Sequence, residues 1–279
     1  LIEAACHWLA AYDVDGYRLD YAAGPSHAFW SEFRAACCAV KADCWLFGEV
    51  TLAGDALRAY TGHLDGCLDF AFCRLLRQLC AGPQPTIALT EFVNAVERSR
   101  AFFGLGQEAF LLPSFLDNHD MNRFLWVAGN DKGRLRLAAG LLFALGGPPI
   151  LYYGTEVGLS QPRGKGPWRE EARHPMLWGA AQDGELLRFF QHLVAARRCH
   201  LALGQGELTT LQLDEERGIW LVELTHADDR VLLAVNVGGK EQVIGLPAGQ
   251  FADLDATAVC QQIQLAGKSL SLLFPRGQA

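Results

Sequence analysis

The stretch Gly16-Tyr17-Arg18-Leu19-Asp20 decides the fold class of this chain. Polar and apolar side chains alternate in and around it, which is typical of a short buried strand. The strand ends on a carboxylate, a loop with Gly24 and Pro25 follows, and a helical pattern covers residues 26–40. A strand, an acidic residue at its carboxyl end, a loop and a helix form one unit of a β/α barrel, in which the carboxyl ends of the strands make the active face.

Arg18 and Asp20 lie on the same face of this strand, because side chains alternate with a period of two. A guanidinium beside the carboxylate would keep Asp20 ionised at neutral pH, and an ionised carboxylate suits a nucleophile. A buried Arg–Asp pair that only braces the barrel would show the same pattern. This stretch alone therefore leaves a catalytic and a structural interpretation open.

Length and charge limit the classes of protein to consider. The 279 residues, 51% of them hydrophobic, suffice for one large domain or for one domain with a small appendage. The net charge of −7 and the absence of a basic run argue against a nucleic-acid partner and against an anionic membrane surface. The longest apolar run, residues 135–153, is interrupted by Arg136 and by Gly146-Gly147-Pro148-Pro149, so no membrane span is predicted.

The cysteines and the first residues bear on the compartment and on completeness. None of the nine cysteines has the paired spacing of a metal-binding knuckle, and reduced cysteines of a cytoplasmic protein are favoured over a disulfide framework. The chain begins with Leu1, and residues 1–12 already have the spacing of an amphipathic helix. We therefore expect that the beginning of the protein is missing.

Further βα units follow the first. Cys44-Trp45-Leu46-Phe47-Gly48-Glu49 is a continuous apolar run that ends on a carboxylate, as a parallel strand buried on both faces requires. The sequence predicts more strands at residues 66–70, 110–116 and 149–154, and helices at 54–61, 71–80, 86–103, 133–145 and 184–198. In one parallel barrel, Asp20, Glu49 and the Asp120 that follows the strand at 110–116 would project from the same rim.

The pattern changes near residue 201. Segments 218–224, 230–237, 241–246 and 265–274 alternate polar and apolar residues, which predicts an antiparallel β-domain with one buried face. We place a partial barrel at residues 1–200 and an all-β domain at residues 201–279. Residues 161–174, rich in Gly, Pro and Arg, are predicted to form a long surface loop.

Paired carboxylates suggest a chemistry. Two carboxyl groups about 5–5.5 Å apart can hydrolyse a glycosidic bond with retention, one as the nucleophile and the other as the acid and then the base. The nucleophile must be ionised, whereas the acid needs apolar surroundings. Asp20 stands beside Arg18 and Glu49 follows Trp45-Leu46-Phe47, so the sequence assigns the nucleophile to Asp20 and the acid/base to Glu49.

Three segments, in this order and spacing, resemble motifs of the α-amylase family of glycoside hydrolases. The stretch 16–20 is similar to the nucleophile motif, Phe47-Gly48-Glu49-Val50 to the acid/base motif, and Phe115-Leu116-Asp117-Asn118-His119-Asp120 to the motif that holds sugar hydroxyls in the transition state. Residues 147–156 resemble the eighth barrel strand, and Pro175-Met176-Leu177-Trp178 the segment after it. The resemblance implies an α/β fold, an incomplete TIM (β/α)8 barrel with about strands 4 to 8, followed by a small antiparallel β-sandwich domain.

The resemblance also implies roles for single residues in a retaining enzyme that acts on starch-like glucans or malto-oligosaccharides through a covalent glycosyl-aspartate. Arg18 would orient the nucleophile, His119 would hold sugar hydroxyls, and Tyr21 would contact the sugar. The catalytic residues would be Asp20, Glu49 and Asp120.

Other side chains carry weaker expectations. Arg123, three positions after Asp120, would lie on the rim or be a solvated charge. Most aromatic residues of an apolar chain belong to its core, so we expect only one or two of the remaining candidates to stack on sugar rings. These candidates are Trp45, Phe70, Phe124, Trp126 and Trp168.

The chain departs from the family pattern in three ways. Barrel strands 1 to 3 and their sugar-binding motif would lie upstream of Leu1. Many family members have a lysine and a histidine after the nucleophile, where the histidine carbonyl helps to hold calcium, but Ala23-Gly24 stands here. No metal site and no cofactor are therefore predicted, and calcium is left open for a longer form of the protein. Finally, an incomplete barrel would leave unpaired apolar edges, so we expect a fragment of a longer enzyme.

Two other functions use the same residues. An α-glucanotransferase differs from a hydrolase in whether a sugar or water resolves the intermediate, and these residues do not distinguish the two. A non-catalytic relative would serve as a binding or scaffold module, but such proteins usually lose a catalytic carboxylate, and all three stand here. The oligomeric state is not predicted, and the isolated chain is expected to be inactive.

Overall fold

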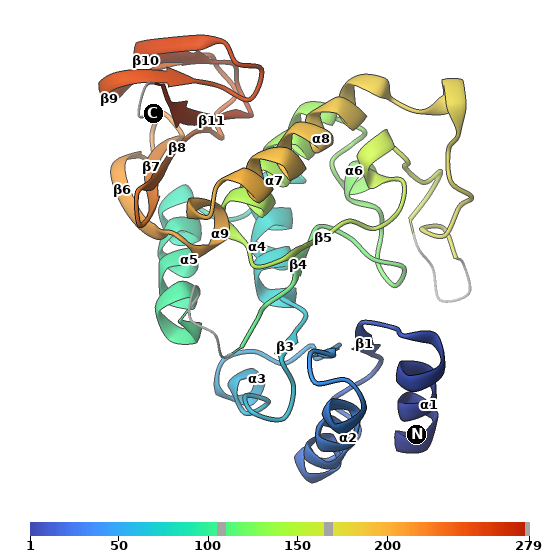
Figure 1. Cartoon of the computed structure of the whole chain (residues 1–279). Coiled ribbons are helices and arrows are strands. Elements are labelled where there is room, and N and C mark those ends of the chain that lie inside the picture. Colours follow the sequence, from blue (N-terminus) through green and yellow to red (C-terminus); the bar gives the residue numbers. More distant parts are fainter. Residues whose placement is uncertain (105–109, 165–169, 277–279) are drawn as a thin grey trace.

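The computed structural model describes residues 1–104, 110–164 and 170–276 (Figure 1). Its N-terminal part begins with α1 (Ile2–Tyr12), which packs on α2 (His27–Val40). Ser26 caps α2, because its side chain accepts a hydrogen bond from the backbone N–H of Phe29 at 3.2 Å. Between the two helices lies β1 (Gly16–Leu19), so the predicted order of strand, loop and helix is confirmed.

The strands of the N-terminal part are parallel neighbours in chain order. β1 pairs with β2 (Trp45–Gly48), and β2 pairs with β3 (Gly66–Cys67). A parallel bridge from Gly66 to Leu111 connects β3 to the segment that leads into β4 (Ser114–Phe115), and β4 pairs with β5 (Pro149–Ile150). This is the order that successive barrel units produce, because each crossover places the next strand beside the previous one.

Several of these strands are shorter than the apolar runs that predict them; β3, β4 and β5 have two residues each. Gly66 permits the close approach of β3 to the next segment, because a Cβ atom there would lie 2.1 Å from the carbonyl oxygen of Leu111. The helices around the strands agree with the predicted positions to within a few residues. They are α3 (Asp55–Arg58), α4 (Phe70–Cys80), α5 (Leu89–Phe103), α7 (Lys132–Leu145) and α8 (Gly184–Cys199), whereas the short helix α6 (Phe124–Val127) was not predicted.

The C-terminal part is an antiparallel sheet, as predicted. Within the described residues it has six strands in the order β10-β9-β11-β8-β7-β6. The predicted segments correspond to β7 (Ile219–His226), β8 (Asp229–Asn236), β9 (Gln242–Ala252) and β11 (Ser269–Pro275), whereas β6 (Glu207–Asp214) and β10 (Ala258–Leu265) were not predicted. Most of β11 pairs with β8, but Phe274 and Pro275 pair with β9, so this strand joins the two halves of the sheet.

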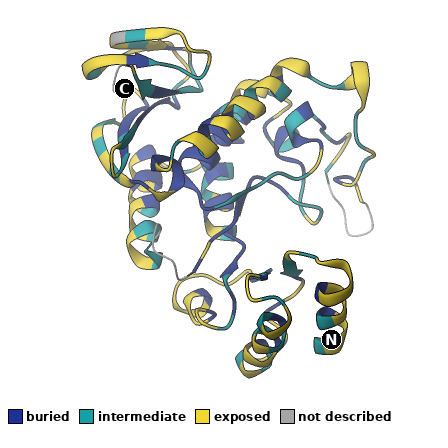
Figure 2. Ribbon diagram, in the orientation of Figure 1, coloured by how far each residue is buried: buried dark blue, intermediate teal, exposed yellow. Residues whose placement is uncertain are grey.

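Helix α7 is the centre of the largest hydrophobic core. Its residues are buried from Leu137 to Leu145, and it contacts α4, α8, α9 (Ala202–Gln205) and β11 (Figure 2). A Cβ atom at Gly140 would lie 2.4 Å from a methyl group of Leu270, so glycine lets α7 lie against the sheet. The core continues from the helices into β7, β8 and β11. The division at residue 200 therefore crosses continuous packing, and it stays a prediction.

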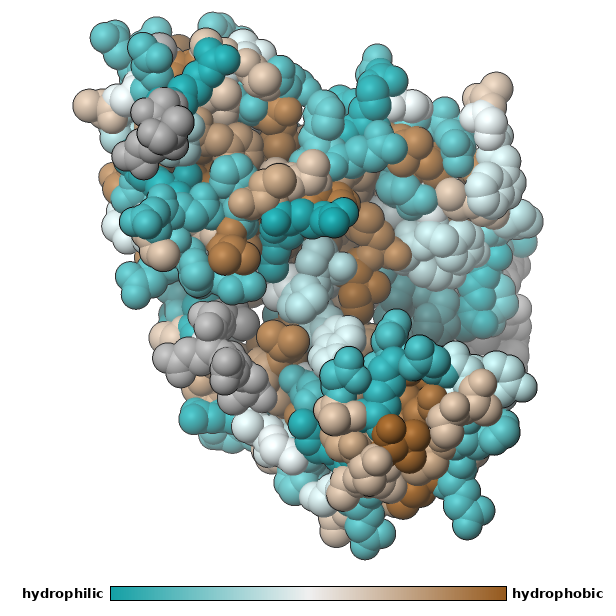
Figure 3. Space-filling model, in the orientation of Figure 1, coloured by the Kyte–Doolittle hydropathy of each residue, from teal (hydrophilic) through white to brown (hydrophobic). Residues whose placement is uncertain are grey.

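A second core holds the first βα unit together. It contains Leu9 of α1, Trp30 and Phe33 of α2, and Leu46 of β2. Apolar side chains also remain on the surface here, and Figure 3 shows apolar colours over the N-terminal helices. Trp8 and Tyr12 of α1 are 49% and 63% exposed. In the described part of the chain, no helix has both the length and the apolar character to cross a membrane.

Candidate active site

Arg18 joins two of the predicted catalytic carboxylates. Its Nη1 forms an ion pair with Asp20, and its Nη2 lies 2.6 Å from Oε2 of Glu49. The sequence indicated the first contact but not the second. Because β1 and β2 are paired with Leu19 opposite Gly48, the residues that follow them reach the same rim. The backbone N–H of Glu49 also donates to the carbonyl of Leu19 at 2.8 Å, which aligns the two strand ends.

The two carboxylates contact the same guanidinium but differ in exposure. The Asp20 side chain is 74% exposed and the Glu49 side chain 15%, so Glu49 is the more buried of the two. The hydrogen bond and the charge of Arg18 lower the pKa of Asp20, and Glu49 and His119 act in the same direction. Asp20 is thus ionised, as expected of a nucleophile. Glu49, expected in an apolar setting, instead contacts the same guanidinium, because parallel pairing brings it beside Arg18.

His119 and Asp120 lie directly beside each other at the end of β4. Nε2 of His119 is 3.1 Å from Oδ2 of Asp120, and the backbone N–H of Asp120 donates to Oδ1 of Asn118 at 2.8 Å. The charge of His119 also reaches Asp20, which connects the β4 end electrostatically to the β1 end. The structure therefore brings the predicted residues of three separate motifs to one region.

Arg173 is a site residue that the sequence analysis missed. Its Nη2 lies 3.1 Å from Oδ1 of Asp120, and its Nε donates to the carbonyl of His119 at 3.1 Å. Nε is also 2.8 Å from a carboxylate oxygen of Glu170. The sequence predicted this segment only as a surface loop, and its high arginine content was the one signal that could have pointed to a contact with a carboxylate. Long-range folding of the loop onto β4 decides the contact.

Arg123 is neither solvated nor on the rim, in contrast to both expectations. It is fully buried, with its guanidinium 3.9 Å from the ring centre of Tyr152 and 4.7 Å from that of Tyr153. Its Nε donates to the carbonyl of Ala172 at 2.8 Å, and its Nη1 to that of Tyr153 at 2.6 Å. Stacking and carbonyl acceptors stabilise the buried cation. Arg123 thereby ties the β4 motif to the segment after β5 and to the loop of Arg173.

Asp117 holds the segment of residues 115–120 in place from its buried side. It is buried, and its carboxylate accepts hydrogen bonds from the backbone N–H of Phe124 at 2.7 Å and from Oγ1 of Thr155 at 3.0 Å. Burial raises the pKa of Asp117, while these hydrogen bonds and the charge of Arg123 oppose the shift. The buried network holds the backbone that carries His119 and Asp120.

Tyr21 presents an aromatic ring next to Asp20. It is 72% exposed, and its φ of 46° places it in the left-handed region, which non-glycine residues rarely adopt. Gly24 makes room for the ring, since a Cβ atom there would lie 2.7 Å from Cε1 of Tyr21. The ring is accessible, and its contact with a sugar stays a prediction.

The other aromatic candidates separate into core and partly exposed residues. Phe124 is fully buried and belongs to the core. Trp45 packs against Phe47 with tilted rings whose centres are 4.5 Å apart, and Phe70 packs edge-on against buried Phe115. Trp126 is half-buried. Trp168 lies outside the described residues.

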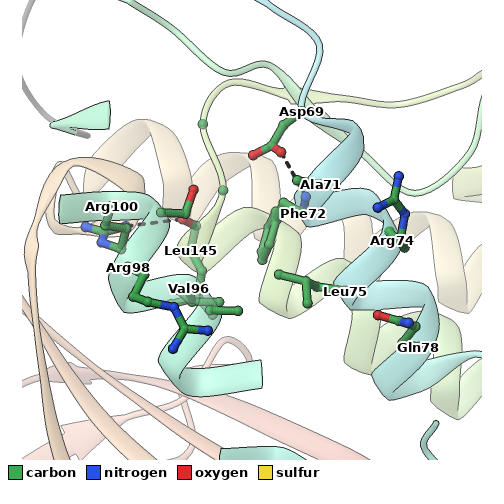
Figure 4. A pocket seen from close by; sticks show the side chains of 14 residues that line it. Asp69, Ala71, Phe72, Arg74, Leu75, Gln78, Val96, Arg98, Arg100 and Leu145 are labelled. Atoms are coloured by element: carbon green, nitrogen blue, oxygen red, sulfur yellow. Dashed lines mark hydrogen bonds between the residues drawn. The ribbon is translucent and has the colours of Figure 1, made fainter. Parts of the chain in front are cut away.

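A cavity between two helices does not coincide with these carboxylates, and the described residues hold no candidate metal site. Across residues 1–104, 110–164 and 170–276, no group of three or more His, Cys, Asp or Glu side chains is placed to hold a metal ion. A cavity of about 410 Å³ lies between α4 and α5, with Asp69, Phe72 and Val96 in its lining (Figure 4). None of the predicted catalytic residues lines it.

Comparisons with known proteins identify the family of this chain. The alpha-amylase catalytic domain family matches residues 1–191. Alpha-amylase 2 of Dictyoglomus thermophilum is 35% identical over 259 residues, and a cyclomaltodextrinase of Geobacillus thermopakistaniensis is 28% identical over 251 residues. The crystal structure of an alpha-amylase from Geobacillus thermoleovorans, in complex with acarbose, matches with a TM-score of 0.81 and 26% identity and covers 100% of this chain.

The fold and the site define a protein of parallel βα units that carries paired carboxylates at one rim and an antiparallel sheet at its C-terminal end. This chain belongs to the alpha-amylase family. It covers only 44% and 41% of the length of the two curated relatives, and 64% of the solved chain.

Proposed function

We propose that this chain carries the catalytic residues of a retaining hydrolase that cleaves α-glucosidic bonds in starch-like glucans or malto-oligosaccharides. The observation that carries the proposal is the contact of one guanidinium, Arg18, with both Asp20 and Glu49 at the end of neighbouring parallel strands. The names of the relatives, alpha-amylase, cyclomaltodextrinase and maltogenic amylase, support this substrate class. A relative named intracellular maltogenic amylase, 28% identical, supports an intracellular location.

The first step is attack by Asp20 on the anomeric carbon. Arg18 keeps this carboxylate ionised and oriented, while Glu49 protonates the leaving oxygen, which gives a covalent glycosyl-aspartate. Glu49 then takes a proton from water, and the water releases the sugar with its original configuration. As the acid of the first step, Glu49 must carry the proton that it gives to the leaving oxygen.

Asp120 and His119 stabilise the transition state. His119 contributes to the lowered pKa of Asp20, and Nε2 of His119 lies 3.1 Å from Oδ2 of Asp120, which supports a shared site. Hydrogen bonds to sugar hydroxyls that tighten as the ring flattens lower the barrier more than they strengthen substrate binding. Tyr21 offers its exposed ring as a stacking surface for the sugar.

We further propose that the active enzyme contains barrel strands in addition to those described. Within the described residues, β1 and β5 end the parallel series, and Trp8 and Tyr12 of α1 leave apolar surface exposed beside it. The share of the relatives that this chain covers supports the proposal. The additional strands would pair with the free edges of β1 and β5 and close the barrel.

Hydrolysis of a chromogenic α-maltoside and of soluble starch tests the function. The assay is run on the protein that the gene encodes and, in parallel, on the 279-residue chain. Asp20→Asn and Glu49→Gln should each lower kcat by more than about 10³-fold with an unchanged circular dichroism spectrum. Proton NMR of the first products should show the α-anomer. Full activity of either variant, or a β-anomeric product, would refute the assignment. Turnover by the short chain alone would instead refute the need for further strands.

A further inference from the structure

Four thiols gather behind the first βα unit, away from the carboxylates. They come from α1, from the last turn of α2 and from the residue before β2. The two that the structure places in contact are Cys38 and Cys44, whose sulfur atoms are 3.9 Å apart. Cys37 is buried, and Cys6 lies on α1. The pair of Cys38 and Cys44 thus joins the last turn of α2 to the residue before β2.

The turn between α2 and β2 holds Cys38 and Cys44 together. The backbone N–H of Cys44 donates to the carbonyl of Lys41 at 3.1 Å, which closes the turn. The ammonium of Lys41 is held in turn by Asp13 at 2.9 Å and by Asp15 at 3.2 Å, both on the segment that leads into β1. The contact between the two sulfur atoms therefore belongs to a turn that is fixed at several points.

We propose that Cys38 and Cys44 form a modification site, a dithiol that a small-molecule disulfide such as oxidised glutathione converts reversibly into an intramolecular disulfide. A disulfide has an S–S bond of about 2.05 Å. Closure therefore requires that the two sulfur atoms, now 3.9 Å apart, move closer together.

The exchange proceeds in two steps. The thiolate of Cys38 attacks one sulfur of oxidised glutathione, which releases one glutathione thiolate and leaves a mixed disulfide on Cys38. The thiolate of Cys44 then attacks the Cys38 sulfur and releases the second glutathione. The protein loses two protons and two electrons, and one molecule of oxidised glutathione becomes two of reduced glutathione.

Burial decides which thiol reacts first. Cys38 is half-buried, whereas Cys44 is 5% exposed and burial raises its pKa to about 11. Burial likewise raises the pKa of Cys37 to about 12, so this neighbour is a poor competitor. Cys38 therefore takes up the small disulfide from solution, and Cys44 resolves it from within the protein. Because little of Cys44 is thiolate at neutral pH, we expect closure over minutes to hours.

The disulfide would link α2 to the start of β2, next to the strands that carry Asp20 and Glu49. Cys44 directly precedes β2, and Glu49 directly follows it, so the bond lies at the opposite end of the strand from the carboxylate. The bond closes a short loop, which makes its entropic stabilisation modest. We expect an increase in Tm by a few degrees and little change in site geometry.

Peptide mapping tests the pairing directly. The protein as its gene encodes it is treated with oxidised glutathione, free thiols are blocked with N-ethylmaleimide, and the sample is digested with trypsin. Cleavage after Arg34, Lys41 and Arg58 separates the two cysteines into the peptides 35–41 and 42–58. The expected result is a linked pair of these peptides, two hydrogens lighter than their sum, which dithiothreitol separates.

Variants identify the sulfur atoms, because peptide 35–41 contains Cys37 as well as Cys38. The linked pair should persist in Cys37→Ala and disappear in Cys38→Ala and in Cys44→Ala. Each variant removes one thiol of the cluster, and Cys37→Ala is the control for truncation at a buried position. Persistence of the linked pair in Cys38→Ala, or a wild-type protein in which both thiols are alkylated after oxidation, would overturn the proposal.

Discussion

Arg18 is the side chain through which the chemistry of this molecule is organised at the scale of single residues. It contacts a carboxylate on its own strand and one on the neighbouring strand, so two charges that would repel each other share a cation. Asp120 is held in a comparable way, between His119 and Arg173. In both places an arginine fixes the direction of a carboxylate that faces the rim.

Replacement of Arg173 by alanine should weaken catalysis more than stability. Asp120 would lose one of its cationic partners, and the carbonyl of His119 would lose a donor. We expect kcat/KM to fall about 10- to 100-fold, mainly through kcat, with Tm nearly unchanged. Steady-state kinetics on a malto-oligosaccharide measure the effect in the protein as its gene encodes it. Arg98→Ala, which removes an exposed arginine of α5, is the matched control and should retain wild-type kinetics. A rise in KM alone would contradict a role in orienting Asp120.

At the scale of elements, one helix cap is a buried carboxylate whose ionisation depends on pH. Asp69 caps α4 by accepting a hydrogen bond from the backbone N–H of Phe72 at 2.8 Å, and the same carboxylate is almost completely buried beside the cavity of Figure 4. Burial raises the pKa of Asp69 to about 6. The folded chain therefore keeps a proton that the unfolded chain releases at lower pH.

The stability that Asp69 contributes should be present at low pH and lost as the pH rises through about 6. Asp69→Asn keeps the capping oxygen but cannot ionise. The free energy of unfolding of the variant, minus that of the wild type, should be about 1 kcal/mol larger at about pH 8 than at about pH 5. The reason is that only the wild type has a buried carboxylate that becomes charged as the pH rises. Thermal unfolding at the two pH values checks the sign. A difference in Tm that is the same at both values would refute the assignment of the buried proton to Asp69.

At the scale of the whole molecule, the helical layer and the C-terminal sheet act as one body. They share the core around α7, and side-chain hydrogen bonds also join them, among them those of Glu215. Glu215, in the turn after β6, accepts hydrogen bonds from the backbone N–H of Leu89 at 3.1 Å and of Thr90 at 2.7 Å. Ala88 at the start of α5 has no capping side chain, so Glu215 supplies the cap from a distant part of the chain.

Removal of this cap should destabilise both parts together. We expect Glu215→Ala to lower the free energy of unfolding by about 1 kcal/mol, since two helix N–H groups lose their acceptor at an exposed site. Glu216→Ala removes the neighbouring exposed carboxylate and should leave stability unchanged. Urea unfolding followed by tryptophan fluorescence compares the two variants. Separate transitions for the helices and for the sheet in the wild type would show that the shared core does not couple them.

Sequence patterns alone determined much of this protein. The alternation in residues 16–20, the apolar run before Glu49 and the spacing of the helices predicted the parallel units, because burial on both faces leaves a local trace in the chain. The antiparallel end was also predictable, although β6 and β10 were missed. These strands lie at the two edges of the sheet, where partial exposure permits the polar residues that obscure the pattern.

Only the tertiary structure decided how the charges are shared. The sequence could place Arg18 beside Asp20, since both lie on one strand, but the register of β1 against β2 brings Glu49 to the same guanidinium. The burial of Arg123 and the approach of Arg173 to Asp120 depend on contacts between segments that are distant along the chain. Local periodicity specifies which residues face inward, whereas the partner that each charged group meets depends on which elements pack together.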